Sequence, residues 1–123
     1  MYLLDQDRAD DVEKFLRSVQ QPRLSISEFS LYSIGIVLFR RKLFDVFMRL
    51  VDDLVINGGV RLLRLSAGDL KELTRIAQQF SLDFDDAYQY AIAERYGLII
   101  VSFDSDFDRT ERGRKTPAEL IGT

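Results

Sequence analysis

Apolar residues recur through most of the chain at the three- and four-residue spacing of amphipathic helices. The pattern predicts helices at Arg8–Val19, Glu28–Arg40 and Lys42–Val55, and another whose apolar stripe runs from Leu70 to Phe80. A further helix is expected at Asp85–Tyr96. Gly97 is placed to end that helix, because glycine freely adopts the positive φ that closes many helices.

Short apolar runs between these helices predict strands. Val60–Leu65 follows a turn formed by Asn57, Gly58 and Gly59, and Arg23–Ser27 is a short extended piece after Pro22. Leu98–Val101 is an unbroken apolar run, which is typical of a strand buried on both faces of a parallel sheet. Strands that alternate with helices in this way predict an α/β sandwich with a parallel sheet.

Three helix starts carry a hydroxyl residue followed three positions later by an acidic residue, the spacing of a capping box. The pairs are Ser25 with Glu28, Ser66 with Asp69, and Thr116 with Glu119. In the last pair Pro117 stands at the first helical position, where proline is favoured. We therefore expect a terminal helical turn after Thr116.

Length and composition indicate one soluble globular domain over residues 1–123. The chain is long enough to bury a core but leaves no room for a second domain. Its apolar runs are too short to span a bilayer, and it does not open with a basic region followed by an apolar stretch. We therefore expect no membrane insertion and a cytoplasmic location.

The sequence contains neither cysteine nor histidine. This excludes disulfides, thiolate chemistry, the common zinc sites and a histidine general base. Any bound metal must take oxygen ligands, which suit magnesium, manganese or calcium. The net charge of −3 argues against a protein that coats nucleic acid through bulk electrostatics.

Aspartates stand at two points that a parallel sheet should bring together. Asp86 lies in the first turn of the expected helix 85–96, and Asp104 and Asp106 follow the strand Leu98–Val101. Open α/β sheets bind ligands at the carboxyl ends of their strands, so we expect these carboxylates at one edge. On spacing alone, however, Asp86 could simply be a helix-start carboxylate that interacts favourably with the helix dipole. Asp104 and Asp106 could likewise be ordinary turn residues.

The stretch Leu82–Asp108 resembles the C-terminal half of a PIN domain, the nuclease fold of VapC-type toxins of toxin–antitoxin pairs. The shared features are Asp86-Ala87 at a helix start, a small-residue helix, Gly97, an apolar strand, and Ser102-Phe103-Asp104 followed by Asp106-Phe107. The resemblance implies a PIN-like α/β/α sandwich and magnesium- or manganese-dependent cleavage of RNA. It implies Asp86, Asp104 and Asp106 as catalytic residues, with Asp86 and Asp104 as metal ligands.

The sequence departs from the family pattern at two places. Family members begin with a strand that ends in an aspartate, followed by a short helix, whereas this chain is expected to lack that first strand. Asp5 would replace the aspartate only if Met1–Leu4 formed the strand. The family's glutamate, which lies inside the next helix, corresponds to Ser33, and Glu28 lies a turn too early.

An incomplete acidic set predicts weak metal binding, because several carboxylates are needed to draw a divalent ion from its hydration shell. Two hypotheses follow. The first is a PIN-type endoribonuclease that acts on RNA and pairs with an antitoxin. The second is an inactive PIN-like scaffold that binds another protein or associates with itself. A missing central strand would favour a homo-oligomer, because it would leave backbone N–H and C=O groups unpaired that a second copy could fill.

Two further expectations concern residues near the acidic stretch. The basic residues Arg109, Arg112, Arg114 and Lys115 either steer an RNA backbone toward the acidic pocket or form a solvated face. On the preceding helix, Tyr88 and Tyr90 are not expected to face inward together.

Overall fold

The computed structural model describes residues 2–5, 24–102, 105–116 and 119. Within them, four parallel strands form one sheet in the order β3-β2-β1-β4. The strands are β1 (Tyr2–Asp5), β2 (Leu24–Ser27), β3 (Arg61–Leu63) and β4 (Ile99–Ser102). The parallel sheet expected from the alternating pattern is therefore confirmed. The helix expected at residues 8–19 lies outside the described residues.

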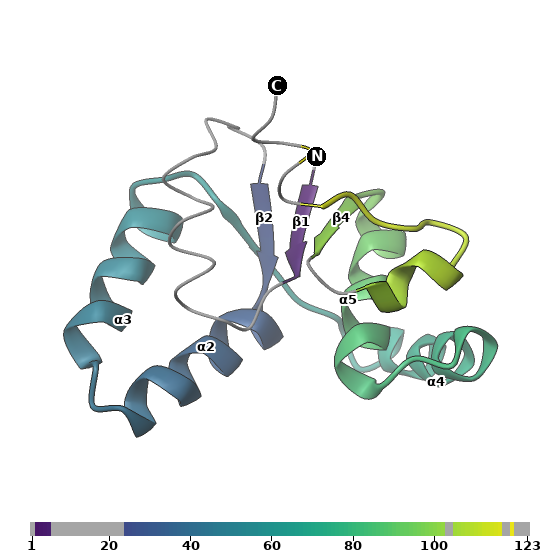
Figure 1. The fold of residues 1–123 in the computed structure, drawn as a ribbon, viewed down its shortest axis with the longest axis horizontal. Coiled ribbons are helices and arrows are strands. Elements are labelled where there is room, and N and C mark those ends of the chain that lie inside the picture. Colours follow the sequence, from purple (N-terminus) through teal and green to yellow (C-terminus); the bar gives the residue numbers. More distant parts are fainter. Residues whose placement is uncertain (1, 6–23, 103–104, 117–118, 120–123) are drawn as a thin grey trace.

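Helices cover both faces of the sheet, as Figure 1 shows. On one side lie α2 (Glu28–Arg40) and α3 (Phe44–Val51), the latter continued by a π-helical turn at Asp52–Ile56. On the other side lie α4 (Asp69–Phe80) and α5 (Phe84–Tyr96). A short 3-10 turn follows β4 at Ser105–Arg109. No helix in these described ranges is long and apolar enough to cross a membrane.

The expectation that the first strand is absent is wrong. Residues Tyr2–Asp5 form β1, which pairs with β2 on one side and β4 on the other. Leu3 is 0% exposed in the core beneath α4 and α5, and Leu4 is 3% exposed in the core beneath α2 and α3. Four residues are enough to form a central strand here. The strands on both sides pair with its backbone N–H and C=O groups, and its successive side chains enter the cores on opposite faces of the sheet.

Helix α2 has the predicted bounds, Glu28–Arg40, but its capping residue differs from the prediction. Ser25 lies within β2 and does not cap the helix; its buried hydroxyl has no hydrogen-bond partner among the residues that the structure describes. The cap is Ser27, whose Oγ accepts a hydrogen bond of 3.0 Å from the backbone N–H of Ser30. Because β2 continues through Ser27, the residue that directly precedes the helix is Ser27, and Ser25 lies too far back in the strand to cap it.

The other two predicted caps are confirmed. The backbone N–H of Ser66 donates to Asp69 Oδ2 and that of Asp69 donates to Ser66 Oγ, both at 3.2 Å. These bonds from Ser66 lower the pKa of Asp69, because they stabilise its charged form. Thr116 and Glu119 make the same reciprocal contacts, at 3.2 and 3.3 Å.

Helix α5 is enclosed on all sides between Asp86 and Ala93. It is therefore buried around its whole circumference, which is typical of a central helix. Tyr88 and Tyr90 are both buried, contrary to the expectation that only one of them faces inward. The Tyr88 hydroxyl accepts a 3.0 Å hydrogen bond from the backbone N–H of Leu65. Gly97 ends the helix with φ +66, as its position predicted.

Candidate functional site

Three neighbouring strands end at one edge of the sheet. Asp5, the last residue of β1, is in register with Ser102, the last residue of β4. Ser27 ends β2 on the other side of β1, and Glu28 follows it as the first residue of α2. Asp5 and Glu28, the two residues that were considered as replacements for missing ligands, therefore both belong to the carboxyl edge.

Asp86 lies in the first turn of α5 and is 8% exposed, whereas its neighbour Asp85 is exposed. Water can solvate Asp85, but a buried carboxylate must be stabilised by groups around it. The first turn of a helix supplies part of that stabilisation through its unpaired N–H groups and dipole. The structure thus separates two adjacent aspartates and places only Asp86 inside the protein.

One turn beyond Asp86, α5 meets the start of α2 through a polar contact that the sequence did not predict. Gln89 is 1% exposed, and its Nε2 donates a hydrogen bond of 2.5 Å to Ser30 Oγ. Its Oε1 is buried and finds no hydrogen-bond partner within the described part of the chain. The sequence signal for this contact is Gln89 itself, a polar residue in a stretch otherwise rich in alanine and aromatic residues.

The two aspartates expected beyond β4 differ in what can be described. Asp104 lies outside the described residues. Asp106 is part of the 3-10 turn and is partly exposed, and one of its oxygens lies 3.4 Å from Arg109 Nη1. Arg109 also donates to the carbonyls of Phe80 and Ser81 at the end of α4. Asp106 is therefore tied through Arg109 to the end of α4.

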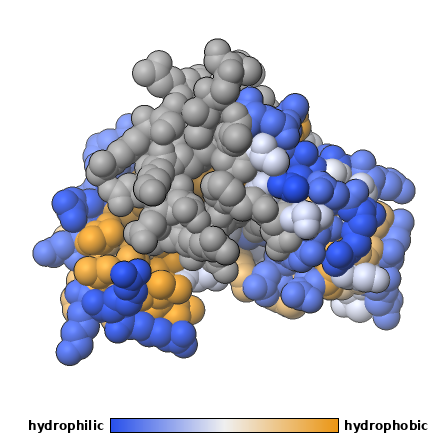
Figure 2. Space-filling view, viewed as in Figure 1, coloured by the Kyte–Doolittle hydropathy of each residue, from blue (hydrophilic) through white to orange (hydrophobic). Residues whose placement is uncertain are grey.

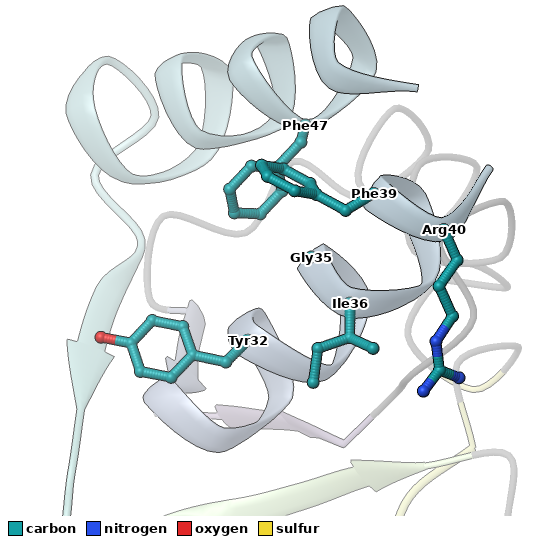
Figure 3. Close-up of a pocket in the computed structure, with 6 residues that line it drawn as sticks. All are labelled: Tyr32, Gly35, Ile36, Phe39, Arg40 and Phe47. Carbon is teal, nitrogen blue, oxygen red and sulfur yellow. The ribbon is translucent and has the colours of Figure 1, made fainter. Parts of the chain in front are cut away.

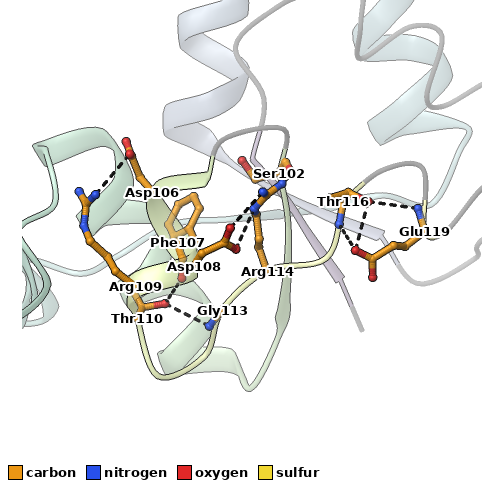
Figure 4. A network of polar contacts seen from close by, with 10 residues as sticks. All are labelled: Ser102, Asp106, Phe107, Asp108, Arg109, Thr110, Gly113, Arg114, Thr116 and Glu119. Atoms are coloured by element: carbon orange, nitrogen blue, oxygen red, sulfur yellow. Dashed lines mark hydrogen bonds and ion pairs between the residues drawn. The ribbon is translucent and has the colours of Figure 1, made fainter.

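The segment after the 3-10 turn folds back against β4 (Figure 4). Arg114 donates to both oxygens of Asp108, at 3.0 and 3.2 Å, and to the carbonyl of Ser102, at 3.0 Å. The Arg114 side chain is only 14% exposed. This arginine therefore joins the end of β4 to the end of the acidic segment.

The basic residues of this loop bind the protein itself. Arg109 and Arg114 donate to carbonyls and aspartates as described, and Arg112 donates to the carbonyl of Leu98 at 3.4 Å. Lys115 lies 3.9 Å from Glu119. These contacts favour a structural role for the loop over the steering of an RNA backbone.

The donors at the sheet edge fit a hard cation that binds oxygen. Asp86 is a buried carboxylate, Asp5 ends the central strand, and the unpaired Oε1 of Gln89 lies one helical turn from Asp86. In the described part of the chain, no group of three or more acidic side chains is close enough to hold a metal. A magnesium or manganese ion at this edge would take such oxygen atoms as ligands, and water would complete its coordination.

A separate apolar surface lies on α2 and α3, away from the sheet edge. Figure 2 shows hydrophobic residues gathered over these helices. A groove of about 420 Å³ opens there, and Figure 3 shows the side chains around it. Its lining residues, here called the α2–α3 groove, are Tyr32, Gly35, Ile36, Phe39, Arg40 and Phe47.

Comparisons with known structures show the same fold. A protein from Pyrobaculum aerophilum, PAE2754, aligns with a TM-score of 0.74 at 20% identity, over 98% of this chain and 92% of the other. A toxin–antitoxin complex from Klebsiella pneumoniae aligns with a TM-score of 0.70 at 20% identity, over 95% and 98%. FitAcB from Neisseria gonorrhoeae aligns with a TM-score of 0.57 at 17% identity, over 98% and 100%.

Sequence comparison identifies the family. A search of curated protein sequences found no significant match. The family model of the PIN domain matches residues 1–113, which include all four strands and the acidic segment after β4. This match agrees with the structure, in which a parallel sheet has helices on both faces and aspartates at its carboxyl edge. The chain belongs to the PIN domain family.

Proposed function

We propose that the protein is a divalent-metal-dependent endoribonuclease of the VapC toxin type. The observation that carries this proposal is the buried carboxylate of Asp86 at the start of α5, in a sheet whose central strand ends in Asp5. Two departures from the family pattern argue against activity: the expected loss of the first strand, and Ser33 at the position of the family's glutamate. Because β1 is present, the first no longer holds, whereas the second remains.

In this proposal Asp86 and Asp104 hold a magnesium or manganese ion, with Asp5 as a third ligand and Asp106 assisting. A bound divalent ion supplies charge neutralisation at the scissile phosphate and a more acidic water. Asp86 contributes a carboxylate in the first turn of α5, where the helix dipole interacts favourably with a negative charge. The weakly exposed position of Asp86 limits its access to bulk water, which strengthens its electrostatic interactions.

The proposed partners follow from the same assignment. RNA is the substrate, and an antitoxin protein holds the activity in check in the cytoplasm. Support for an antitoxin comes from the structural neighbour that is described as a toxin–antitoxin complex. The family membership supports a nuclease, and the oxygen-rich donor set at the sheet edge supports a hard divalent ion.

The experiment that tests this function is cleavage of a fluorescently labelled single-stranded RNA by the purified chain. We expect cleavage in magnesium or manganese and none in EDTA, because the carboxylates alone cannot neutralise the phosphate. The Asp104→Asn variant should lose the activity. Cleavage that survives both EDTA and this substitution would contradict the proposal and indicate a contaminating nuclease.

The alternative function, a scaffold that associates with itself, is favoured by one observation, the α2–α3 groove. Ile36 and Phe39 in this groove are 54% and 53% exposed, and Met48, which follows the lining residue Phe47 in α3, is 63% exposed. Contiguous apolar surface of this kind marks interaction sites. The same helices carry cations such as Arg40 and anions such as Asp45, so that a second copy can match both charge signs. We propose a second copy of this chain as the occupant.

Replacing Ile36 by aspartate is expected to convert a dimer into a monomer, because a charge in the groove must then be desolvated on association. Light scattering with size-exclusion chromatography measures this change. Ile56→Asp is the matched control: Ile56 is 67% exposed and lies outside the groove, so this variant should stay dimeric. A wild-type chain that elutes at the mass of one 14.2 kDa copy throughout a concentration series would contradict self-association.

A further inference from the structure

We propose that the exposed side chain of Phe84 is a stacking surface for an unpaired base of the RNA substrate. This inference rests on the proposed ribonuclease function. Phe84 is the first residue of α5 and stands two positions before Asp86, the buried carboxylate of the candidate site. Phe84 is 55% exposed, whereas Asp86 is 8% exposed. A large aromatic side chain is therefore open to solvent within the same helical turn as the carboxylate.

Phe84 belongs to a cluster of three aromatic rings that joins the starts of α2 and α5. Its ring centroid lies 5.9 Å from that of Phe29, the second residue of α2, and 6.4 Å from that of Tyr88, one turn further along α5. The rings of Phe29 and Tyr88 are 5.5 Å apart. Helix α2 begins where β2 ends, and α5 runs back to the start of β4, so both helices begin at the carboxyl edge of the sheet (Figure 1). The cluster therefore lies at the edge that carries the candidate site.

The two inner rings of the cluster are held by the core. Tyr88 is buried, and its hydroxyl accepts the 3.0 Å hydrogen bond from the backbone N–H of Leu65. Phe29 is partly buried and packs against the core between the sheet, α4 and α5. Aromatic pairs at these centroid distances attract one another beyond the effect of area burial. Phe84 is thus positioned by its neighbours, so that a ligand can stack on it at little cost in side-chain ordering.

The surroundings of Phe84 favour a nucleobase as the occupant. The residues on either side of it in the sequence, Asp83 and Asp85, are exposed. A protein partner would have to cover these carboxylates along with the ring, because specific protein interfaces bury about 800 Å² on each side, and their desolvation is costly. A base covers one ring and leaves both carboxylates in water. Every base has a π face, so that stacking needs no base-specific hydrogen bond.

The test is binding of a fluorescently labelled single-stranded RNA, measured by fluorescence anisotropy in EDTA so that the RNA stays intact. We expect Phe84→Ala to bind about five- to a hundredfold more weakly than the wild type, the usual effect of removing one ring on which a base stacks. Phe84→Trp keeps an aromatic face and should bind as the wild type does. Phe44→Ala is the matched control and should also bind normally. Phe44 is likewise the first residue of a helix and is 47% exposed, but α3 begins beyond the far end of α2.

An abasic RNA of the same length, which keeps the phosphates and lacks the bases, separates stacking from a structural role of the ring. The wild type should prefer the intact RNA, and Phe84→Ala, shown by circular dichroism to be folded, should lose about five- to a hundredfold of that preference. If Phe84→Ala does not fold, Phe84→Leu replaces it. An unchanged preference in the variant would overturn the inference and leave Phe84 as a contact for a protein partner.

The cleavage assay in magnesium distinguishes this inference from the proposed function. A wild type that cleaves RNA, together with a folded Phe84→Ala variant that binds intact RNA equally well, would overturn the inference alone. A wild type that shows the expected dependence of binding on Phe84 but cleaves no RNA would contradict the proposed function alone. A wild type that neither binds nor cleaves RNA would overturn both.

Discussion

Replacement of Asp86 by asparagine is expected to reduce metal-dependent RNA cleavage by at least about a hundredfold. The reason is that a metal ion held by carboxylates lowers the energy of the transition state by several kcal/mol, and loss of one ligand weakens this stabilisation. Asparagine has nearly the same shape, so the fold should be retained. The rate of cleavage of a labelled RNA in excess magnesium measures the effect. Asp86 is chosen because it is the one sequence-predicted ligand that the structure describes as a buried carboxylate.

Asp85→Asn provides a matched control for this experiment. It removes the same charge from the same helical turn, but from an exposed side chain. Both variants lose the favourable interaction with the helix dipole, which is worth about 0.3–1 kcal/mol. We therefore expect comparable stability in the two variants and near wild-type cleavage by Asp85→Asn only. Equal loss of activity in both would indicate a general electrostatic effect rather than a specific role of Asp86.

Replacement of Leu3 by alanine is expected to destabilise the protein by about 2–5 kcal/mol, the usual cost of removing a large buried aliphatic side chain. Leu3 is 0% exposed and belongs to the core between the sheet, α4 and α5. Because β1 lies between β2 and β4, a cavity here weakens the packing at the centre of the sheet. Urea unfolding followed by circular dichroism measures the loss.

The control for Leu3 is Ile99→Ala in the neighbouring strand β4. Ile99 is 43% exposed, so its replacement should cost distinctly less than that of Leu3. The register places Ile99 opposite Tyr2, so that both substitutions lie in paired strands of one sheet. Similar losses in the two variants would contradict the central position of β1.

Most of the sheet and helix order follows from local patterns in the sequence. The apolar run Leu98–Val101 and the stop at Gly97 correctly predicted β4 and the end of α5, with the strand observed one residue later at Ile99–Ser102. β1 was missed because four residues are too few for a periodic pattern and their role depends on pairing with β2 and β4. Long-range pairing thus determines β1, which local reasoning missed.

In the candidate site, too, the sequence predicted individual residues, whereas the contacts between elements became visible only in the structure. Asp86 was predicted as a site residue from the resemblance to the PIN family, because its place at a helix start alone also fits a residue that interacts with the helix dipole. The structure adds that Asp86 is buried while Asp85 is exposed. The contacts of Gln89 with Ser30 and of Arg114 with Ser102 join residues from different elements. Such contacts depend on how elements pack, so that no spacing along the chain reveals them. Ser25 was misassigned as a cap because the spacing alone does not show where β2 ends.

The proposed function depends on Asp86 as part of a site for a hard divalent cation at the carboxyl edge of the sheet. Binding of Mn²⁺, followed by electron paramagnetic resonance in the wild type, Asp86→Asn and Asp85→Asn, tests it most directly. We predict one weak site in the wild type and in Asp85→Asn, and its loss in Asp86→Asn. Equal Mn²⁺ binding by all three proteins would contradict the account.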